Sequence, residues 1–232
     1  MNNEFEKIEH LYKEKKFSEV LEIVNEGIKN NQPKCFNMLG ILYMNGEQVK
    51  KSERKAFKCF KKAASLSYPN SFYNLGRCYL YGYGTLKCKR KAFISFLKGV
   101  ELGSTLSNKS LADCYFFGWG TKEDHSLAFE YYKKGMELGD DLSSLRVAAC
   151  YSTGQGIEKD EKSALVIYKT LANKGNDEAV YRLGLAYLYG YGVEINEEVA
   201  IENIRKASQL GNKKAKMRLE RDLKALNEKY KI

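Results

Sequence analysis

The sequence predicts an all-α protein, built as a solenoid of five helix-turn-helix repeats. The first observation is a tyrosine that recurs every 36 residues, at Tyr43, Tyr79, Tyr115, Tyr151 and Tyr187. The second is a set of glycine and alanine columns that keep the same register in every copy. The third is that no stretch shows the alternation of apolar and polar residues that is typical of strands. A fixed period of about 20 to 50 residues is typical of repeat proteins.

The first helix of each repeat ends near the repeat tyrosine. A Leu or Val and a Gly or Ala precede the tyrosine by four and three residues, so all three share one helical face. The small residue lets a second helix approach closely. A glycine pair, three and five residues after the tyrosine, ends this helix because glycine accepts positive φ values. In the first repeat the helix is predicted over residues 34–45, and Gln48 replaces the second glycine, so this loop departs from the pattern.

The second helix of each repeat begins nine residues after the tyrosine. Four of the five residues there are strong N-caps: Ser52, Cys88, Asp124, Asp160 and Asn196, with Cys88 the exception. An alanine recurs four residues later, on the face that meets the first helix. A glycine 24 residues after the tyrosine ends the second helix, and Ser67 takes its place in the first repeat. There the second helix is predicted over residues 52–66.

The two ends of the chain fit a capped array. Residues 4–30 contain two amphipathic stretches, which predict a helix pair with a shortened loop. Residues 213–232 continue the register but are highly charged, which predicts a capping helix with a soluble outer face. With no linker and no low-complexity tract, we predict one domain over 1–232: an N-terminal helix pair at 1–34, five repeats at 35–212 and the capping helix.

The best-formed repeat resembles a known family. The run Leu-Gly-Leu-Ala-Tyr-Leu-Tyr-Gly-Tyr-Gly-Val at 183–193, followed by Ala200 and Gly211, resembles the Sel-one-like repeat. The resemblance covers about residues 35–212. It implies a right-handed α/α superhelical solenoid related to tetratricopeptide repeats, with an N-terminal pair close to a plain tetratricopeptide unit. It also implies an adaptor for protein complexes rather than an enzyme.

Composition limits the class of protein and its compartment. The chain has 232 residues, 44% of them hydrophobic, and a negative mean hydropathy, which is ordinary for a soluble protein. No apolar run is long enough for a transmembrane helix. Residues 1–10 are too charged for a signal peptide. The expected compartment is therefore the cytoplasm.

The six cysteines are predicted to be reduced, buried and structural. Cys78, Cys114 and Cys150 occupy one column, and equivalent positions in stacked repeats lie about 10 Å apart, too far for a disulfide. With no C-x-x-C motif and only His10 and His125, the sequence predicts neither a metal site nor a cofactor. His125 is expected at the surface. No nucleophile stands beside a plausible base, so no catalytic residue is assigned.

Charge is uneven along the array. Residues 35–70 and 71–106 each carry a net charge of +5, whereas residues 107–142 carry −3. Many of the basic residues lie on the second helices of the first two repeats, within 50–98. This pattern fits a solvated face, and it also fits a dock for an acidic partner surface, with nucleic acid or an anionic membrane less favoured.

Residues that change between repeats are the candidates for partner binding. By analogy with tetratricopeptide units, the inner face carries the residues six and two before the tyrosine and two after it, with the loop residue between the glycines nearby. Tyr, Trp and Arg most often dominate binding energy. The candidates are Tyr73, Arg77, Tyr81, Tyr83, Lys109, Asp113, Phe117, Trp119, Arg146, Tyr181, Arg182, Tyr189 and Tyr191. Trp119 with Phe116 and Phe117 is the preferred anchor, and the alternative is that the loop aromatics pack on the neighbouring repeat.

The main functional hypothesis is a non-catalytic, monomeric scaffold that binds a protein partner in a concave groove from about Tyr73 to Tyr189. A narrower version is an immunity protein that neutralises a toxin. One alternative is an enzyme acting on cell-wall-derived ligands. The other is a binder of acidic partners, nucleic acid or anionic membrane through residues 50–98.

Overall fold

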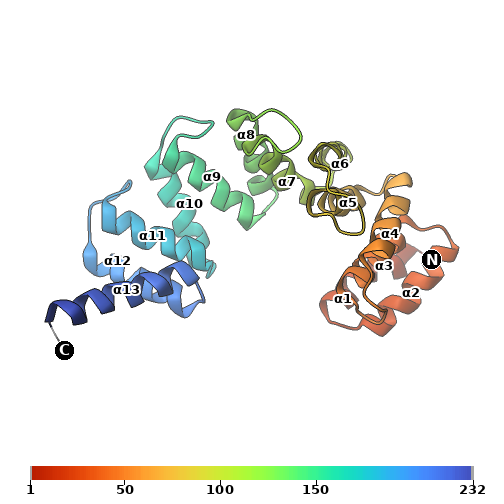
Figure 1. Ribbon diagram of the computed structural model, residues 1–232, viewed down its shortest axis with the longest axis horizontal. Helices are drawn as coiled ribbons and strands as arrows, with labels where there is room; N and C mark the ends of the chain where they lie inside the picture. Colours follow the sequence, from red (N-terminus) through yellow and green to blue (C-terminus); the bar gives the residue numbers. More distant parts are fainter. Residues whose placement is uncertain (1, 231–232) are drawn as a thin grey trace. The chain divides into compact units, whose positions relative to one another are not determined.

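In a computed structural model, the structure describes the backbone of residues 2–230 and the side chains of residues 7–221. Thirteen α-helices and no strand lie within this backbone, so the all-α prediction is confirmed (Figure 1). The helices are α1 (Asn2–Lys13), α2 (Phe17–Lys29), α3 (Pro33–Asn45), α4 (Glu53–Ser65), α5 (Pro69–Tyr81), α6 (Lys89–Glu101), α7 (Thr105–Phe116), α8 (His125–Glu137), α9 (Asp141–Thr153), α10 (Glu161–Asn173), α11 (Asp177–Tyr189), α12 (Glu197–Gln209) and α13 (Lys213–Tyr230). None of the described helices is long and apolar enough to span a membrane.

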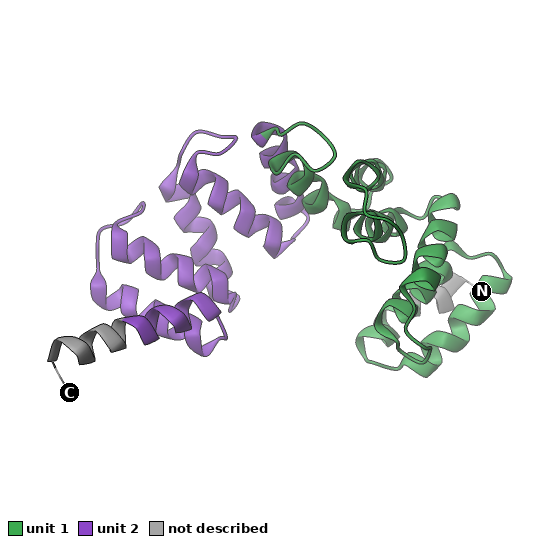
Figure 2. Ribbon diagram, in the orientation of Figure 1, with its two compact units in different colours: residues 1–124 green, residues 125–232 purple. Residues whose placement is uncertain are grey.

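The chain forms two compact units (Figure 2). Unit 1, residues 1–124, contains α1 to α7, and unit 2, residues 125–232, contains α8 to α13. Within each unit, consecutive helices pack against one another, most extensively the two helices of a repeat, such as α3 with α4 and α11 with α12. The predicted N-terminal helix pair is α1 with α2, and the capping helix is α13. The single domain over 1–232 stays a prediction.

The helix ends follow the expected caps. Ser52, Asp160 and Asn196 each accept a hydrogen bond from the backbone N–H three residues on, at 3.0 to 3.3 Å, whereas Cys88 makes no side-chain cap. The first repeat keeps the same turns without glycine, because Gln48 and Ser67 adopt φ values of 57° and 58°. That left-handed conformation costs a residue with a Cβ roughly 1–2 kcal/mol.

The loop glycines also allow a close approach of backbone to backbone. A Cβ at Gly84 would collide with the carbonyl of Glu53 at the start of α4, and one at Gly192 would lie 2.6 Å from the carbonyl oxygen of Glu161 at the start of α10. The glycine loop of one repeat is therefore packed on the second helix of the preceding repeat. This contact explains why the second loop glycine recurs.

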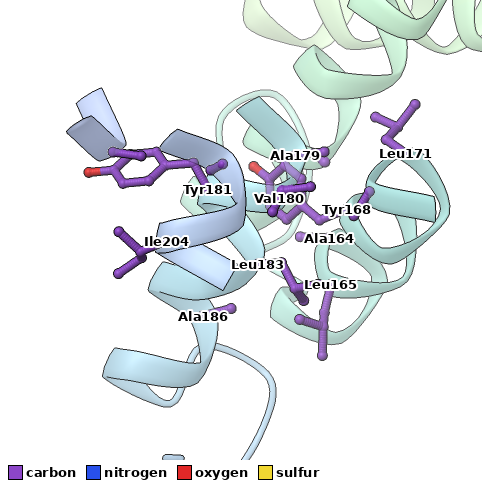
Figure 3. Packing of buried hydrophobic residues seen from close by; sticks show 14 residues of the cluster. Ala164, Leu165, Tyr168, Leu171, Ala179, Val180, Tyr181, Leu183, Ala186 and Ile204 are labelled. Atoms are coloured by element: carbon purple, nitrogen blue, oxygen red, sulfur yellow. The ribbon is translucent and has the colours of Figure 1, made fainter. Parts of the chain in front are cut away.

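The core of each unit is built from the repeat columns. The alanine column, represented by Ala56, Ala92 and Ala200, is fully buried at the contact between the two helices of a repeat. In unit 2, Figure 3 shows side chains of α10, such as Leu165 and Tyr168, gathered against Val180 and Leu183 of α11. The columns that repeat are thus the scaffold of the molecule, as the sequence predicts.

The cysteine and histidine predictions need two corrections. All six cysteines are free, and four are buried, but Cys59 and Cys88 are only half-buried. Cys88 is less covered because it lies at the junction of the loop and α6. His125 is half-buried rather than at the surface, since the loop of the next repeat packs on its backbone at Gly156.

The environment of the buried thiols makes them unreactive. Burial raises the pKa of the Cys78 and Cys114 thiols to about 12, so both stay protonated near neutral pH. Among residues 7–221, no three His, Cys, Asp or Glu side chains are grouped so as to hold a metal ion.

Candidate functional site

Unit 1 contains a hollow of about 540 Å³, here called the unit 1 hollow. Its walls come mainly from the first helices of successive helix pairs: α1, α3, α5 and the start of α7. Three predicted site residues line it, namely Tyr73, Arg77 and Tyr83. A volume between about 300 and 1,000 Å³ is typical of ligand pockets.

Two residues of the lining, Tyr12 and Asn45, belong to a hydrogen-bonded cluster. The Asn45 amide donates to the Tyr12 hydroxyl at 2.7 Å, and that hydroxyl donates to the Glu47 carboxylate at 2.7 Å. Burial and the Glu47 carboxylate raise the pKa of Tyr12 to about 12, so this hydroxyl remains a donor. The cluster ties α1 to the loop of the first repeat.

The lining of the unit 1 hollow combines apolar side chains, such as Met38 and Ile41, with amide and basic groups. The Asn74 amide of α5 donates to the Asn37 side-chain oxygen of α3 at 2.9 Å. Arg77 is exposed, and its guanidinium lies over the Tyr73 ring at 5.6 Å from the centroid. Lys34 forms an ion pair with Glu9 at 3.3 Å. The wall therefore offers amide groups beside positive charge.

The aromatic loop residues pack in pairs within their own loops. The residues two and four after the repeat tyrosine, here called the loop pair, contact each other in each of repeats two, three and five. The ring centroids lie 5.5 Å apart for Tyr81 and Tyr83, 4.9 Å for Phe117 and Trp119, and 5.6 Å for Tyr189 and Tyr191. The three residues of the preferred anchor lie together, since the ring centroids of Phe116 and Phe117 are also 4.9 Å apart.

In repeats one and four the loop pair is polar and small. Asn45 and Glu47 are 3.3 Å apart from amide nitrogen to carboxylate oxygen. The Thr153 hydroxyl donates to the Ala149 carbonyl at 2.8 Å and lies 3.2 Å from the Gln155 side-chain oxygen. Asn45 and Glu47 also bond to Tyr12 of α1, whereas the printed bonds of Thr153 stay within α9 and its own loop.

Two predicted candidates offer little surface to a partner. Asp113 is 9% exposed and forms an ion pair with Lys109, another candidate, at 2.6 Å. Tyr181 is also 9% exposed, in the core cluster of unit 2. Both were expected on an open inner face, but their neighbours in the fold already cover them. Arg146 is exposed on α9.

Unit 2 contains a second hollow of about 310 Å³, here called the unit 2 hollow. Its floor is aliphatic, formed by Ala164, Leu165, Leu185 and Ala186. Two predicted residues, Arg182 and Tyr191, lie on its lining together with Ser152, Thr153, Lys159, Glu161 and Tyr168. Arg182 Nε donates to Glu178 at 2.9 Å, and Lys159 pairs with Glu161 at 2.7 Å. The positive charges at this hollow are therefore balanced.

Sequence reasoning missed several lining residues. In unit 1 these include Tyr12 and Asn74, and in unit 2 Thr153 and Tyr168. A signal for Asn74 was present, because it stands five residues before its repeat tyrosine, in the same column as the candidates Arg146 and Arg182. Tyr12 had no such signal, since its place depends on how α1 meets the first repeat.

Comparisons with known proteins agree with this architecture. The family profile described as Sel1 repeat matches residues 37–68, 72–104, 107–140, 142–176 and 177–212. A Sel1 repeat protein from Oxalobacter formigenes is similar over 91% of this chain and 86% of its own, with 31% identity and a TM-score of 0.80. A search of the curated proteins found no match.

Other solved structures are similar at lower identity. A protective antigen of uropathogenic Escherichia coli with an SLR fold matches 88% of this chain with 28% identity and a TM-score of 0.77, and the match spans only 44% of the antigen. An immunity protein of Pseudomonas aeruginosa matches 89% of this chain and 82% of its own, with 17% identity and a TM-score of 0.59. This last likeness shows the fold alone.

Proposed function

We propose that this chain, which belongs to the Sel1 repeat family, is a non-catalytic scaffold that binds a protein partner through the first helices of its repeats. Sel1 repeat proteins are protein-interaction scaffolds and are generally non-catalytic. The binding residues are those that vary between repeats, because the columns that repeat are occupied in building the core. We also propose a cytoplasmic monomer, which cell fractionation and size-exclusion chromatography test.

The observation that carries the proposal is the unit 1 hollow. It is lined by side chains from four first helices, and among them are an exposed Arg77, Tyr73 and Tyr83. Arginine and tyrosine are enriched among the residues that dominate binding energy, and each also makes directed hydrogen bonds. A hollow with such a lining suits side chains that project from another protein.

The test is affinity purification from the native cell with a matched pair of variants. Tyr73→Ala with Arg77→Ala removes the centre of the unit 1 hollow. Lys58→Ala with Lys61→Ala changes two exposed lysines of α4 and is the control. We expect the wild type and the lysine variant to retain the same partner, and the hollow variant to lose it at an unchanged melting temperature. Loss with the lysine variant alone would instead favour the basic face of residues 50–98 as the binding site.

A narrower proposal is that the partner is a toxin and the chain is its immunity protein. What supports it is the fold shared with immunity proteins of Pseudomonas aeruginosa, at 17% and 19% identity. Co-expression with each toxin-like gene of the same genome tests it: the chain should restore growth with one of them and not with the others. Survival of cells that express those genes without the chain would count against this version.

A further inference from the structure

We propose that the unit 1 hollow is a socket for an acidic, extended peptide segment of the partner. This inference rests on the proposed function and deepens it, because it names the chemistry that the hollow recognises. Three features carry it: the reason why the space is open, the charge of its lining and the hydrogen-bonding groups that remain available.

The space is open because two facing side chains are short. The residue two after a repeat tyrosine faces the residue 29 positions further along the chain, which lies on the first helix of the next repeat or on α13. Between α11 and α13 the first of these residues is an aromatic that reaches across: the Arg218 guanidinium of α13 donates to the Tyr189 hydroxyl of α11 at 2.9 Å and lies over its ring. At the equivalent step between α3 and α5 the residues are Asn45 and Asn74, which bond to Tyr12 and Asn37 instead. The gap between these two helices is therefore left unfilled.

The same rule accounts for the unit 2 hollow. At the step between α9 and α11 the facing residues are Thr153 and Arg182. The threonine is too short to reach across, and its hydroxyl donates to the Ala149 carbonyl of its own helix. Both hollows thus follow a small polar loop pair and precede an aromatic one, with Tyr83 or Tyr191 on the lining. In both cases the open space goes with a short side chain two residues after the tyrosine.

The lining of the unit 1 hollow carries an excess of positive charge. Its ionisable side chains are Lys13, Lys34 and Arg77 against Glu9, which is already paired with Lys34. The Glu47 carboxylate lies beside the lining and accepts hydrogen bonds from Tyr12 and Asn45, so one positive charge remains in excess. Among residues 7–221, no carboxylate lies within ion-pair distance of Arg77, whose face is stacked on Tyr73. The edge of the guanidinium is therefore open to a ligand, and its fork of N–H donors matches a carboxylate. An acidic side chain fits this position.

The hydrogen-bonding groups match a peptide backbone. In the bond between Asn74 and Asn37, the Asn74 amide is the donor and the Asn37 oxygen is the acceptor. N–H donors of both amides and the Asn74 oxygen remain, so the pair lines the hollow with donors beside an acceptor, although Asn37 is only 6% exposed. An extended peptide offers a carbonyl and an N–H on the same edge, which satisfies both. The asparagine pair would hold the main chain while Arg77 receives the acidic side chain.

The experiment is selection of a random twelve-residue peptide library, displayed on phage, against the full chain and three exposed-site variants. Asn45→Tyr fills the unit 1 hollow with the residue type that stands at Tyr81 and Tyr189. Arg77→Glu reverses its central charge. Thr153→Tyr fills the unit 2 hollow in the same way and is the matched control.

We expect wild-type selection to enrich Asp and Glu. The selected peptides should bind Asn45→Tyr and Arg77→Glu at least about tenfold more weakly, and Thr153→Tyr unchanged, with equal melting temperatures throughout. Selected peptides without an acidic excess, no peptide above background, or undiminished binding to Asn45→Tyr would each overturn the inference. If these results occur while the Tyr73 and Arg77 double variant still loses the native partner, the scaffold function stands and only the proposed chemistry fails.

Discussion

The two hollows occupy the same register position in two different repeats, yet their linings differ in chemistry. Both linings contain apolar side chains, such as Met38 and Ile41 in unit 1 and Leu165 and Leu185 in unit 2, but only the unit 1 hollow adds an asparagine pair and an arginine with no carboxylate partner among the described residues. Arg77 stacks on a ring, while Arg182 is held by the Glu178 carboxylate. A short residue two after the repeat tyrosine therefore leaves each space open, and the other residues that vary decide what it can hold. One scaffold can in this way present two unlike sockets.

The largest expected effect tests the shared scaffold. Gly84→Ala in unit 1 and Gly192→Ala in unit 2 each place a Cβ against a backbone carbonyl at a positive φ, of 65° and 70°. Because backbone cannot move aside as a flexible side chain does, we expect each variant to lower the free energy of unfolding by at least about 2 kcal/mol. Urea denaturation monitored by circular dichroism measures it.

The matched controls for the glycine variants are Arg77→Ala and Arg182→Ala. Both change exposed lining residues, and we expect each to alter the free energy of unfolding by less than about 1 kcal/mol. If a lining variant lowers the free energy of unfolding as much as a glycine variant does, the division between scaffold columns and variable lining is wrong.

The second effect separates the two hollows by their response to salt. Peptides that depend on the unit 1 hollow should bind about threefold to tenfold more weakly in 0.5 M than in 0.05 M NaCl, because salt screens the attraction between Arg77 and a carboxylate. Peptides selected on Asn45→Tyr, which leaves the unit 2 hollow open, should be nearly insensitive over the same range. Fluorescence anisotropy with labelled peptides gives both affinities, and equal salt dependence would remove the distinction.

The third effect follows from Tyr12, whose pKa is raised to about 12 from an unfolded value near 10. Between these values the folded chain binds a proton that the unfolded chain has lost. This contribution to stability is therefore fully present below pH 10 and is lost as the pH rises towards 12. We expect Tyr12→Phe to make the fall in stability over this pH range less steep, whereas Tyr43→Phe, at the tyrosine of the first repeat, serves as the comparison variant. Urea denaturation at pH 9, 10 and 11 measures the slope, and identical slopes for Tyr12→Phe and the wild type would contradict the assignment.

Much of the fold could be predicted from sequence because the residue type in each repeat column is set by one local backbone constraint. Gly84 needs a positive φ and a close backbone approach, and Asp160 caps a helix, so both are readable from spacing alone. The ion pair of Lys109 with Asp113 was also open to prediction, since residues four apart on a helix are neighbours.

The candidate site was less predictable because a hollow depends on which side chains reach across between helices. Asn45 turns towards Tyr12 rather than towards Asn74, and nothing in the column of Asn45 indicates that choice. Tyr12 itself belongs to the irregular N-terminal pair, whose register with the first repeat is set by packing. Burial of Tyr181 likewise follows from its neighbours in the core cluster and not from its residue type.

The smallest expected effect concerns the unit 2 hollow. It tests whether this hollow fails to attract acidic peptides only because Glu178 neutralises Arg182. Glu178 accepts hydrogen bonds from Arg182, Asn212 and Lys214, and together these partners lower the pKa of its carboxyl although burial opposes them. Glu178→Gln removes the negative charge and leaves Arg182 uncompensated beside the aliphatic floor. We expect acidic peptides carrying a leucine to bind this variant about twofold to threefold better than the wild type, a gain limited by the exposure of Arg182 to solvent. Glu220→Gln, on an exposed glutamate of α13, is the control. If Glu178→Gln gains nothing, the difference between the hollows lies in shape and apolar lining rather than in the pairing of their arginines.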